Sequence, residues 1–155
     1  MSIGIIIIFH NNSDDIKPKI VVKNIASIID AKICLVDNNS KDDTLEKILE
    51  VKKNCEHLVS VVQIKKKVSI ESAKRAGARF MSNSFDLKHI GFIDVNEIKR
   101  LNYDLNDIIK SINLERDEII NFERKINQIQ RVKSTLLKSV FSILDYFQSQ
   151  DLKYN

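Results

Sequence analysis

The chain has 155 residues, with 25 lysine and arginine residues against 21 aspartate and glutamate residues, which gives a formal net charge of +4. This length fits one domain. A composition of 43% hydrophobic and 30% charged residues excludes a largely disordered chain. The longest apolar run, at residues 5–9, is far too short to cross a bilayer, and the N-terminus lacks the pattern of a signal peptide. We therefore expect a cytoplasmic protein.

Strands and helices alternate along the first part of the chain. Residues 2–9 include four consecutive isoleucines, a β-branched run that predicts a central strand buried on both faces. Apolar residues at 16–29 follow at helical spacing, with Pro18 in the first turn, where proline is tolerated. Further strands are predicted at 32–36, 58–64, 90–93 and 118–122, and further helices at 44–55, 70–81, 104–112 and 132–147.

This alternation defines the expected fold class. Strands that alternate with helices of about ten to fifteen residues form parallel sheets through right-handed crossovers. We therefore predict an α/β fold with three layers and a mostly parallel, Rossmann-like sheet. Cys34 and Cys55 fall in a predicted strand and a predicted helix, without CxxC spacing. We interpret both as buried apolar residues, not as a disulfide or a zinc site.

Polar clusters follow four of the predicted strands. Ligands of open parallel sheets bind beyond the carboxyl ends of the strands. This rule selects residues 9–12, 37–40, 65–67 and 94–96. We expect these four clusters to meet at one pocket.

Each cluster also has a structural interpretation. Residues 37–43 are rich in turn formers, and the three lysines at 65–67 fit a solvated loop. Facing a diphosphate, the same lysines and Lys74 would neutralise it. His10 is interpreted as structural, because neither of the other two histidines supplies a matching partner. Asp94 carries the strongest functional signal, since burial of an unpaired carboxylate costs on the order of several kcal/mol.

Four motifs in this chain resemble those of the family 2 glycosyltransferases, in the same order. Residues 5–12, Ile-Ile-Ile-Ile-Phe-His-Asn-Asn, resemble that family's first strand with its Thr-His-Asn or Tyr-Asn ending. Residues 34–44, Cys-Leu-Val-Asp-Asn-Asn-Ser-Lys-Asp-Asp-Thr, closely resemble its Val-Asp-Asn-Gly-Ser-x-Asp-x-Thr signature. Residues 72–77 are similar to its Ala-Arg-Asn-x-Gly helix start, and residues 91–96 to the strand that ends in its Asp-x-Asp metal motif.

The resemblance implies a GT-A fold and a role for individual positions. Residues 1–122 would form the nucleotide-sugar-binding domain, and residues 123–155 a basic amphipathic helical segment of the same domain. The implied reaction transfers a sugar, with inversion, from a nucleoside-diphosphate sugar such as a UDP-sugar to a glycan or lipid-linked acceptor, as in polysaccharide biosynthesis. The implied nucleotide-sugar-binding residues are Phe9, His10, Asn11, Asp37, Asn39, Lys66, Lys74 and Asp94, and the implied ligands of a Mg²⁺ or Mn²⁺ ion are Asp94 and Asn96.

The chain departs from the family pattern at two points. Asn96 stands where the family has its second aspartate, and a neutral amide is a weaker ligand for a hard divalent cation than a carboxylate. The family's general-base carboxylate is not matched by Glu97, Glu115, Asp117 or Glu118. A catalytically impaired homologue that serves as a binding or assembly partner is therefore the second hypothesis.

The positive charge is concentrated near the C-terminus. Residues 123–138 hold five basic residues and one acidic residue, and the rest of the chain is neutral. This segment is similar to the one that follows the donor domain in polyprenyl-phosphate glycosyltransferases. Through residues 123–148 it would meet either the inner face of a membrane or a second copy of the chain. The neutral remainder and the few aromatic residues argue against nucleic acid as a partner.

Overall fold

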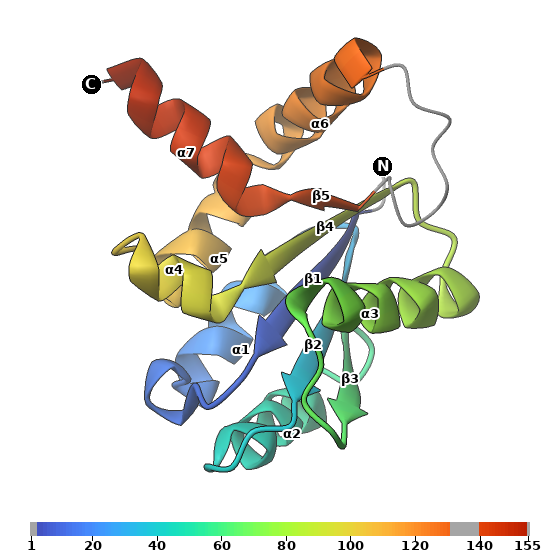
Figure 1. The fold of residues 1–155 in the computed structure, drawn as a ribbon, viewed down its shortest axis with the longest axis vertical. Coiled ribbons are helices and arrows are strands. Elements are labelled where there is room, and N and C mark those ends of the chain that lie inside the picture. The colour runs from blue at the N-terminus through green and yellow to red at the C-terminus, as the bar shows by residue number, and fades with distance from the viewer. Residues whose placement is uncertain (1–2, 131–139, 155) are drawn as a thin grey trace.

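A five-stranded parallel sheet forms the centre of the computed structural model, which describes residues 3–130 and 140–154 (Figure 1). Its strand order is β3-β2-β1-β4-β5, and every neighbouring pair is parallel. The strands are β1 (Ile3–Phe9), β2 (Ala31–Asn38), β3 (Val59–Ile64), β4 (His89–Asp94) and β5 (Val140–Ser142). The predicted α/β class with a parallel sheet is confirmed.

Helices cover both faces of this sheet. The α-helices are α1 (Pro18–Ala26), α2 (Thr44–Asn54), α3 (Ile70–Ser84), α4 (Val95–Arg100), α5 (Leu105–Leu114), α6 (Arg116–Gln130) and α7 (Ile143–Tyr154). Helix α3 packs on one face, and α1, α2 and α5 pack on the opposite face (Figure 1). We call these the α3 face and the α5 face. None of the described helices is long and apolar enough to span a membrane.

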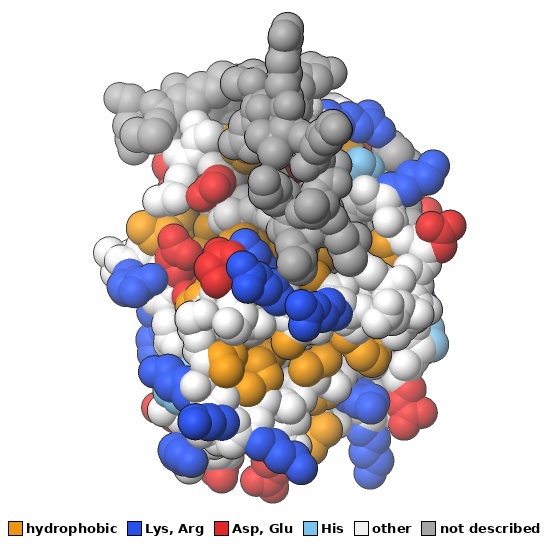
Figure 2. All heavy atoms as spheres, turned by 45° about the vertical axis from the view of Figure 1, so that its right-hand side comes forward, with side chains coloured by type: hydrophobic (Ala, Val, Ile, Leu, Met, Phe, Trp, Pro, Cys, Tyr) orange, Lys and Arg blue, Asp and Glu red, His pale blue; other side chains and the backbone are white. Residues whose placement is uncertain are grey.

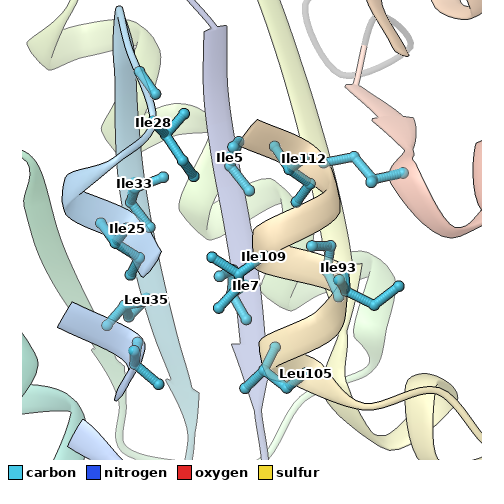
Figure 3. Packing of buried hydrophobic residues seen from close by; sticks show 14 of the residues in the cluster. Ile5, Ile7, Ile25, Ile28, Ile33, Leu35, Ile93, Leu105, Ile109 and Ile112 are labelled. Carbon is cyan, nitrogen blue, oxygen red and sulfur yellow. The ribbon is translucent and has the colours of Figure 1, made fainter. Parts of the chain in front are cut away.

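Strand β1 is buried on both faces, as the isoleucine run predicts. All seven of its residues are buried. Ile5 and Ile7 point to the α5 face, where side chains of α1 and α5 cover them (Figure 3). Ile6 and Ile8 point to the α3 face. Both cysteines are buried and free, and burial raises the pKa of the Cys34 thiol to about 12, which keeps it protonated and unreactive.

The C-terminal part differs from the sequence prediction. Residues 118–122 are predicted as a strand but lie within α6. The expected end of the nucleotide-sugar-binding domain, at residue 122, therefore falls inside this helix. A short apolar run fits either structure, and here Ile119, Ile120 and Glu123 are buried together at helical spacing. Glu123 accepts a buried hydrogen bond from His89 (2.8 Å), which ties α6 to the start of β4.

The fifth strand is instead formed by Val140–Ser142, beside β4. This overturns part of the predicted helix at 132–147, because the described helix begins only at Ile143. Residues 132–139 of that predicted helix lie outside the described residues. The C-terminal strand and helix pack close to β4, where a Cβ added to Gly91 would come within 2.7 Å of Ile143.

Gly77 allows α3 to lie close to β1, as its small-residue face predicts. A Cβ added at this position would come within 2.8 Å of Cγ2 of Ile6, which is fully buried. We expect Gly77→Ala to destabilise the fold by about 1–2 kcal/mol, because this overpacking outweighs the gain of about 1 kcal/mol in helix propensity. Urea unfolding measures this, and the cost should fall in an Ile6→Ala background. An equal cost in both backgrounds would contradict the contact.

Candidate functional site

The carboxyl ends of β1, β2 and β4 bring most of the predicted site residues together. The register pairs Phe9 of β1 with Asp37 of β2, and Ile8 of β1 with Asp94 of β4. Adjacent strands lie about 4.8 Å apart, so the two aspartates stand on either side of the β1 tip. Chain order reverses direction between β1 and β4, and such a switch point is where open α/β sheets bind ligands.

The side chains of the two aspartates point to opposite faces of the sheet. Side chains alternate along a strand, so Asp37 follows Leu35 toward the α5 face, and Asp94 lies opposite Ile93, toward the α3 face. Both are buried, with 2% and 5% of their surface exposed. A ligand that contacts both must therefore lie across the edge of the sheet, above the β1 tip.

Strand β2 is longer than predicted and includes Asp37 and Asn38. Asn38 pairs with Ile64 in the sheet and points to the α3 face. Its side chain makes two hydrogen bonds to the backbone of Val68, accepting from the N–H (3.0 Å) and donating to the carbonyl (2.8 Å). Asn38 thus fixes the loop that carries Lys66, a residue exposed to solvent.

The β1 and β2 tips are joined by polar residues in tight turns. Asn11 and Asn39 both have positive φ, of 56° and 52°, a conformation that asparagine tolerates better than most residues. The backbone N–H of Asn11 donates to Ser40 Oγ (2.9 Å), and Asn11 Oδ1 accepts from the backbone N–H of Lys41 (2.7 Å). Phe9 is a core residue just below this turn, with 2% of its surface exposed.

His10 is held by both ring nitrogens. Nδ1 lies 2.7 Å from the carbonyl oxygen of Asn38, so Nδ1 carries the proton. Nε2 lies 3.2 Å from the Asn11 side-chain nitrogen and accepts its hydrogen bond. These bonds support the structural interpretation of His10.

Asn12 is the buried centre of the polar network. It belongs to the predicted cluster at residues 9–12, but no binding role was predicted for it. Only 1% of its surface is exposed. Its backbone N–H donates to Thr44 Oγ1 (2.8 Å), and its Oδ1 accepts from the backbone N–H of His10 (2.7 Å). Its Nδ2 donates to Asn96 Oδ1 (2.8 Å), which links β1 to the start of α4. A second asparagine after a strand was the only sequence signal for this role.

Asp42 closes the same loop from the side of α2. Asp42 is exposed, and the slight desolvation that acts to raise its pKa is outweighed by hydrogen bonds from the Thr44 hydroxyl and from the backbone of Ser13 and Thr44, so the pKa lies below its ordinary value. Asp42 Oδ1 accepts from Thr44 Oγ1 (2.5 Å), and Oδ2 from the backbone N–H of Ser13 (3.1 Å). The carboxylate therefore orders the loop.

Lys74 lies on the same face as Asp94. Its ammonium group is 2.9 Å from Glu71 and 5.0 Å from the ring centre of Phe92, two residues before Asp94 on β4. Figure 2, with the α3 side turned forward, shows lysine and arginine side chains around a strip of hydrophobic side chains. Lys74 thus borders the region near Asp94.

Asp94 caps helix α4. Its Oδ1 accepts from the backbone N–H of Asn96 (3.1 Å). Burial raises the pKa of Asp94, while hydrogen bonds from the backbone of Asn96 and Glu97 and the charge of Arg100 act in the opposite direction. Neither Asp94 nor Asp37 forms a salt bridge with any residue that the structure describes.

The donor set at residues 94–96 is weak for a divalent cation, because it contains a single carboxylate. Mg²⁺ is usually held by one or two carboxylates together with substrate phosphates and water. Here Asp94 supplies one carboxylate, and the Asn96 amide oxygen already accepts a hydrogen bond. No group of three or more histidine, cysteine, aspartate or glutamate residues that could hold a metal occurs within residues 3–130 and 140–154.

The family is established by its sequence model, since Glycosyl transferase family 2 matches residues 4–148. The chain therefore belongs to glycosyl transferase family 2, and its parallel α/β sheet agrees with the GT-A fold expected from its motifs. No curated protein matches the sequence significantly.

Several solved structures resemble this chain over part of their length. TarS 1–349 from S. aureus matches with a TM-score of 0.48 and 16% identity over 66% of this chain and 31% of that chain. The same protein in complex with UDP-GlcNAc matches with a TM-score of 0.48 and 17% identity over 61% of this chain and 26% of that chain. The mannosyltransferase PcManGT from Pyrobaculum calidifontis, in complex with GDP-Man and Mn²⁺, matches with a TM-score of 0.45 and 18% identity. This match covers 51% of this chain and 24% of that chain. This chain thus spans less than a third of each.

The raised pKa of Asp94 predicts a pH-dependent stability difference. Folding raises this pKa, so the folded state binds the proton more tightly than the unfolded state. The free energy of unfolding therefore falls as the pH rises from the ordinary pKa of 3.8 through the raised value, because Asp94 then ionises. Asp94→Asn keeps an oxygen for the helix cap and removes the charge. We expect its stability relative to the unmodified protein to increase between pH 3 and pH 7, measured by urea unfolding at each pH. A constant or decreasing difference would contradict the burial cost.

Proposed function

We propose that the carboxyl edge of the sheet binds a nucleoside-diphosphate sugar, with a UDP-sugar as the donor, and that the domain transfers the sugar with inversion to an acceptor. The observation that carries the proposal is the pair of buried carboxylates, Asp37 and Asp94, on either side of the β1 tip and without a salt bridge among the described residues. Family membership supports the same assignment.

The chemistry of a nucleotide fits this pair. Buried carboxylates that lack a cation need hydrogen-bond donors. The imide N–H of uracil can donate to one carboxylate and the ribose hydroxyls to the other. A nucleoside that lies across the sheet edge would then place its diphosphate toward the α3 face. Lys66 on the tethered loop and Lys74 beside Phe92 lie on that side.

The acceptor side is proposed between α5 and α7. The chain passes from Asp94 through α4 to a cavity of about 400 Å³ whose lining includes Tyr103, Asp107, Glu115 and Phe147. Carboxylates accept hydrogen bonds from sugar hydroxyls, and aromatic rings pack on sugar faces. We propose a glycan or the sugar part of a lipid-linked glycan as its ligand.

The acceptor proposal predicts sugar contacts at this cavity. Saturation-transfer NMR with a panel of oligosaccharides should show binding that Asp107→Asn weakens several-fold and that Asp117→Asn, an exposed change on α6, leaves unchanged. If Asp107→Asn binds oligosaccharides as well as Asp117→Asn does, this cavity is excluded as the acceptor site.

One observation favours a second candidate function, a catalytically impaired homologue that binds nucleotide or a partner protein. Asn96 stands at the position where the family's metal motif ends in aspartate, and its amide is engaged with Asn12 and His10. Turnover of a sugar nucleotide that depends on Asp94 would exclude this candidate. Contact with a membrane surface or a second copy through residues 123–148 stays a prediction, because residues 131–139 lie outside the described residues.

The nucleotide proposal predicts specific losses of binding. Asp37→Asn and Asp94→Asn should each weaken UDP binding about tenfold or more, since a hydrogen bond to a charged group contributes about 1.5–3 kcal/mol. Asp43→Asn is the matched control, because Asp43 is exposed in the same loop and makes no side-chain cap to α2. Calorimetry with UDP measures all three. Undiminished affinity of both site variants would refute the proposal.

A further inference from the structure

Asn96 joins the tips of β1 and β4 through two side-chain hydrogen bonds of opposite sense. Its Oδ1 accepts from Asn12 Nδ2 (2.8 Å), and its Nδ2 donates to the carbonyl oxygen of His10 (3.1 Å). Both partners belong to the segment that follows β1, and Asn12 is buried. A carboxamide is suited to this place because it supplies one acceptor and two donors on the same planar group.

An aspartate at this position would lose one of the two bonds. Its carboxylate could still accept from Asn12, but the other oxygen would face the carbonyl oxygen of His10 without a hydrogen between them. Asn96 is partly buried, and at such a position an acceptor without a donor and a partly desolvated charge both destabilise the folded state. The local structure therefore selects asparagine over a metal-binding carboxylate.

The same edge of the sheet offers positive charge from the protein itself. Lys65, Lys66 and Lys67 are exposed on the loop that Asn38 fixes at Val68. Helix α3 begins directly after this loop, with Ser69 as its N-cap, and helix N-termini favour anions. Lysines in an ordered loop can offset the charge of a diphosphate, which is the role that a divalent cation would otherwise have.

We propose that Asn96 is a positioning residue that locks the β1 and β4 tips together, and that this domain binds nucleoside diphosphates without a divalent cation, with Lys65–Lys67 neutralising the diphosphate. The nucleotide half of this inference rests on the proposed function. The locking half rests only on the hydrogen bonds of Asn96.

Calorimetry with UDP tests the nucleotide half. The affinity should agree within about threefold in EDTA and in Mn²⁺. Changing Lys65, Lys66 and Lys67 together to glutamine should weaken binding at least tenfold in both buffers. The matched control changes Lys52 and Lys53, exposed in the last turn of α2, to glutamine and should have no effect. A tenfold gain in affinity on adding Mn²⁺ would overturn metal-free binding.

Stability measurements test the lock without any nucleotide. Asn96→Asp should lower the folded-to-unfolded ratio at pH 7 at least tenfold in urea unfolding, whereas Asn121→Asp, exposed on α6, should change it little. The absence of a deficit in Asn96→Asp, or an equal deficit in Asn121→Asp, would overturn the lock.

Titration with Mn²⁺ alone distinguishes a failure of metal-free binding from a failure of the proposed nucleotide function. Neither the unmodified protein nor Asn96→Asp should bind Mn²⁺ in a manner that depends on Asp94. If UDP binds under no condition, the proposed function and the nucleotide half fail together, and the unfolding data still decide the lock. Asp94-dependent Mn²⁺ binding by the unmodified protein would overturn the metal-free inference directly.

Discussion

The burial of strand β1 on both faces is the constraint on which the rest of the structure depends. Its residues pack alternately against the α5 and α3 faces, and β2 and β4 pair with its two edges. No polar side chain fits along such a strand, so polar residues begin only where the strand ends. The candidate site lies at this tip because the apolar run stops at Phe9.

The polar groups at this tip are buried and largely satisfied by one another. Asn12 and Asn38 have almost no exposed surface, and each connects its strand to another segment through side-chain hydrogen bonds. A fully satisfied buried network fixes one arrangement. The tips of β1, β2 and β4 are thus preorganised, and a ligand need not order them on binding. Preorganisation lowers the entropic cost of binding.

Asp37 and Asp94 differ from these asparagines. Each carboxylate is buried, yet among the described residues each accepts hydrogen bonds only from nearby backbone N–H groups and forms no salt bridge. Buried carboxylates without a cation destabilise a fold, so their presence indicates a function other than stability. Binding sites commonly hold residues of this kind, and here they support the assignment of the edge as a nucleotide site.

The sequence by itself determined the class of fold and indicated the edge that carries the candidate site, because hydrophobic periodicity and the position of polar residues after strands are local properties. It also indicated Asp37 and Asp94. Only the tertiary structure decided that residues 118–122 are helical and that Val140–Ser142 completes the sheet, since a short apolar segment takes the form that its neighbours bury. The roles of Asn12, Asn38 and Asn96 were likewise decided by tertiary structure. Their partners lie 30 or more residues away, and no local pattern encodes a hydrogen bond between the ends of separate strands.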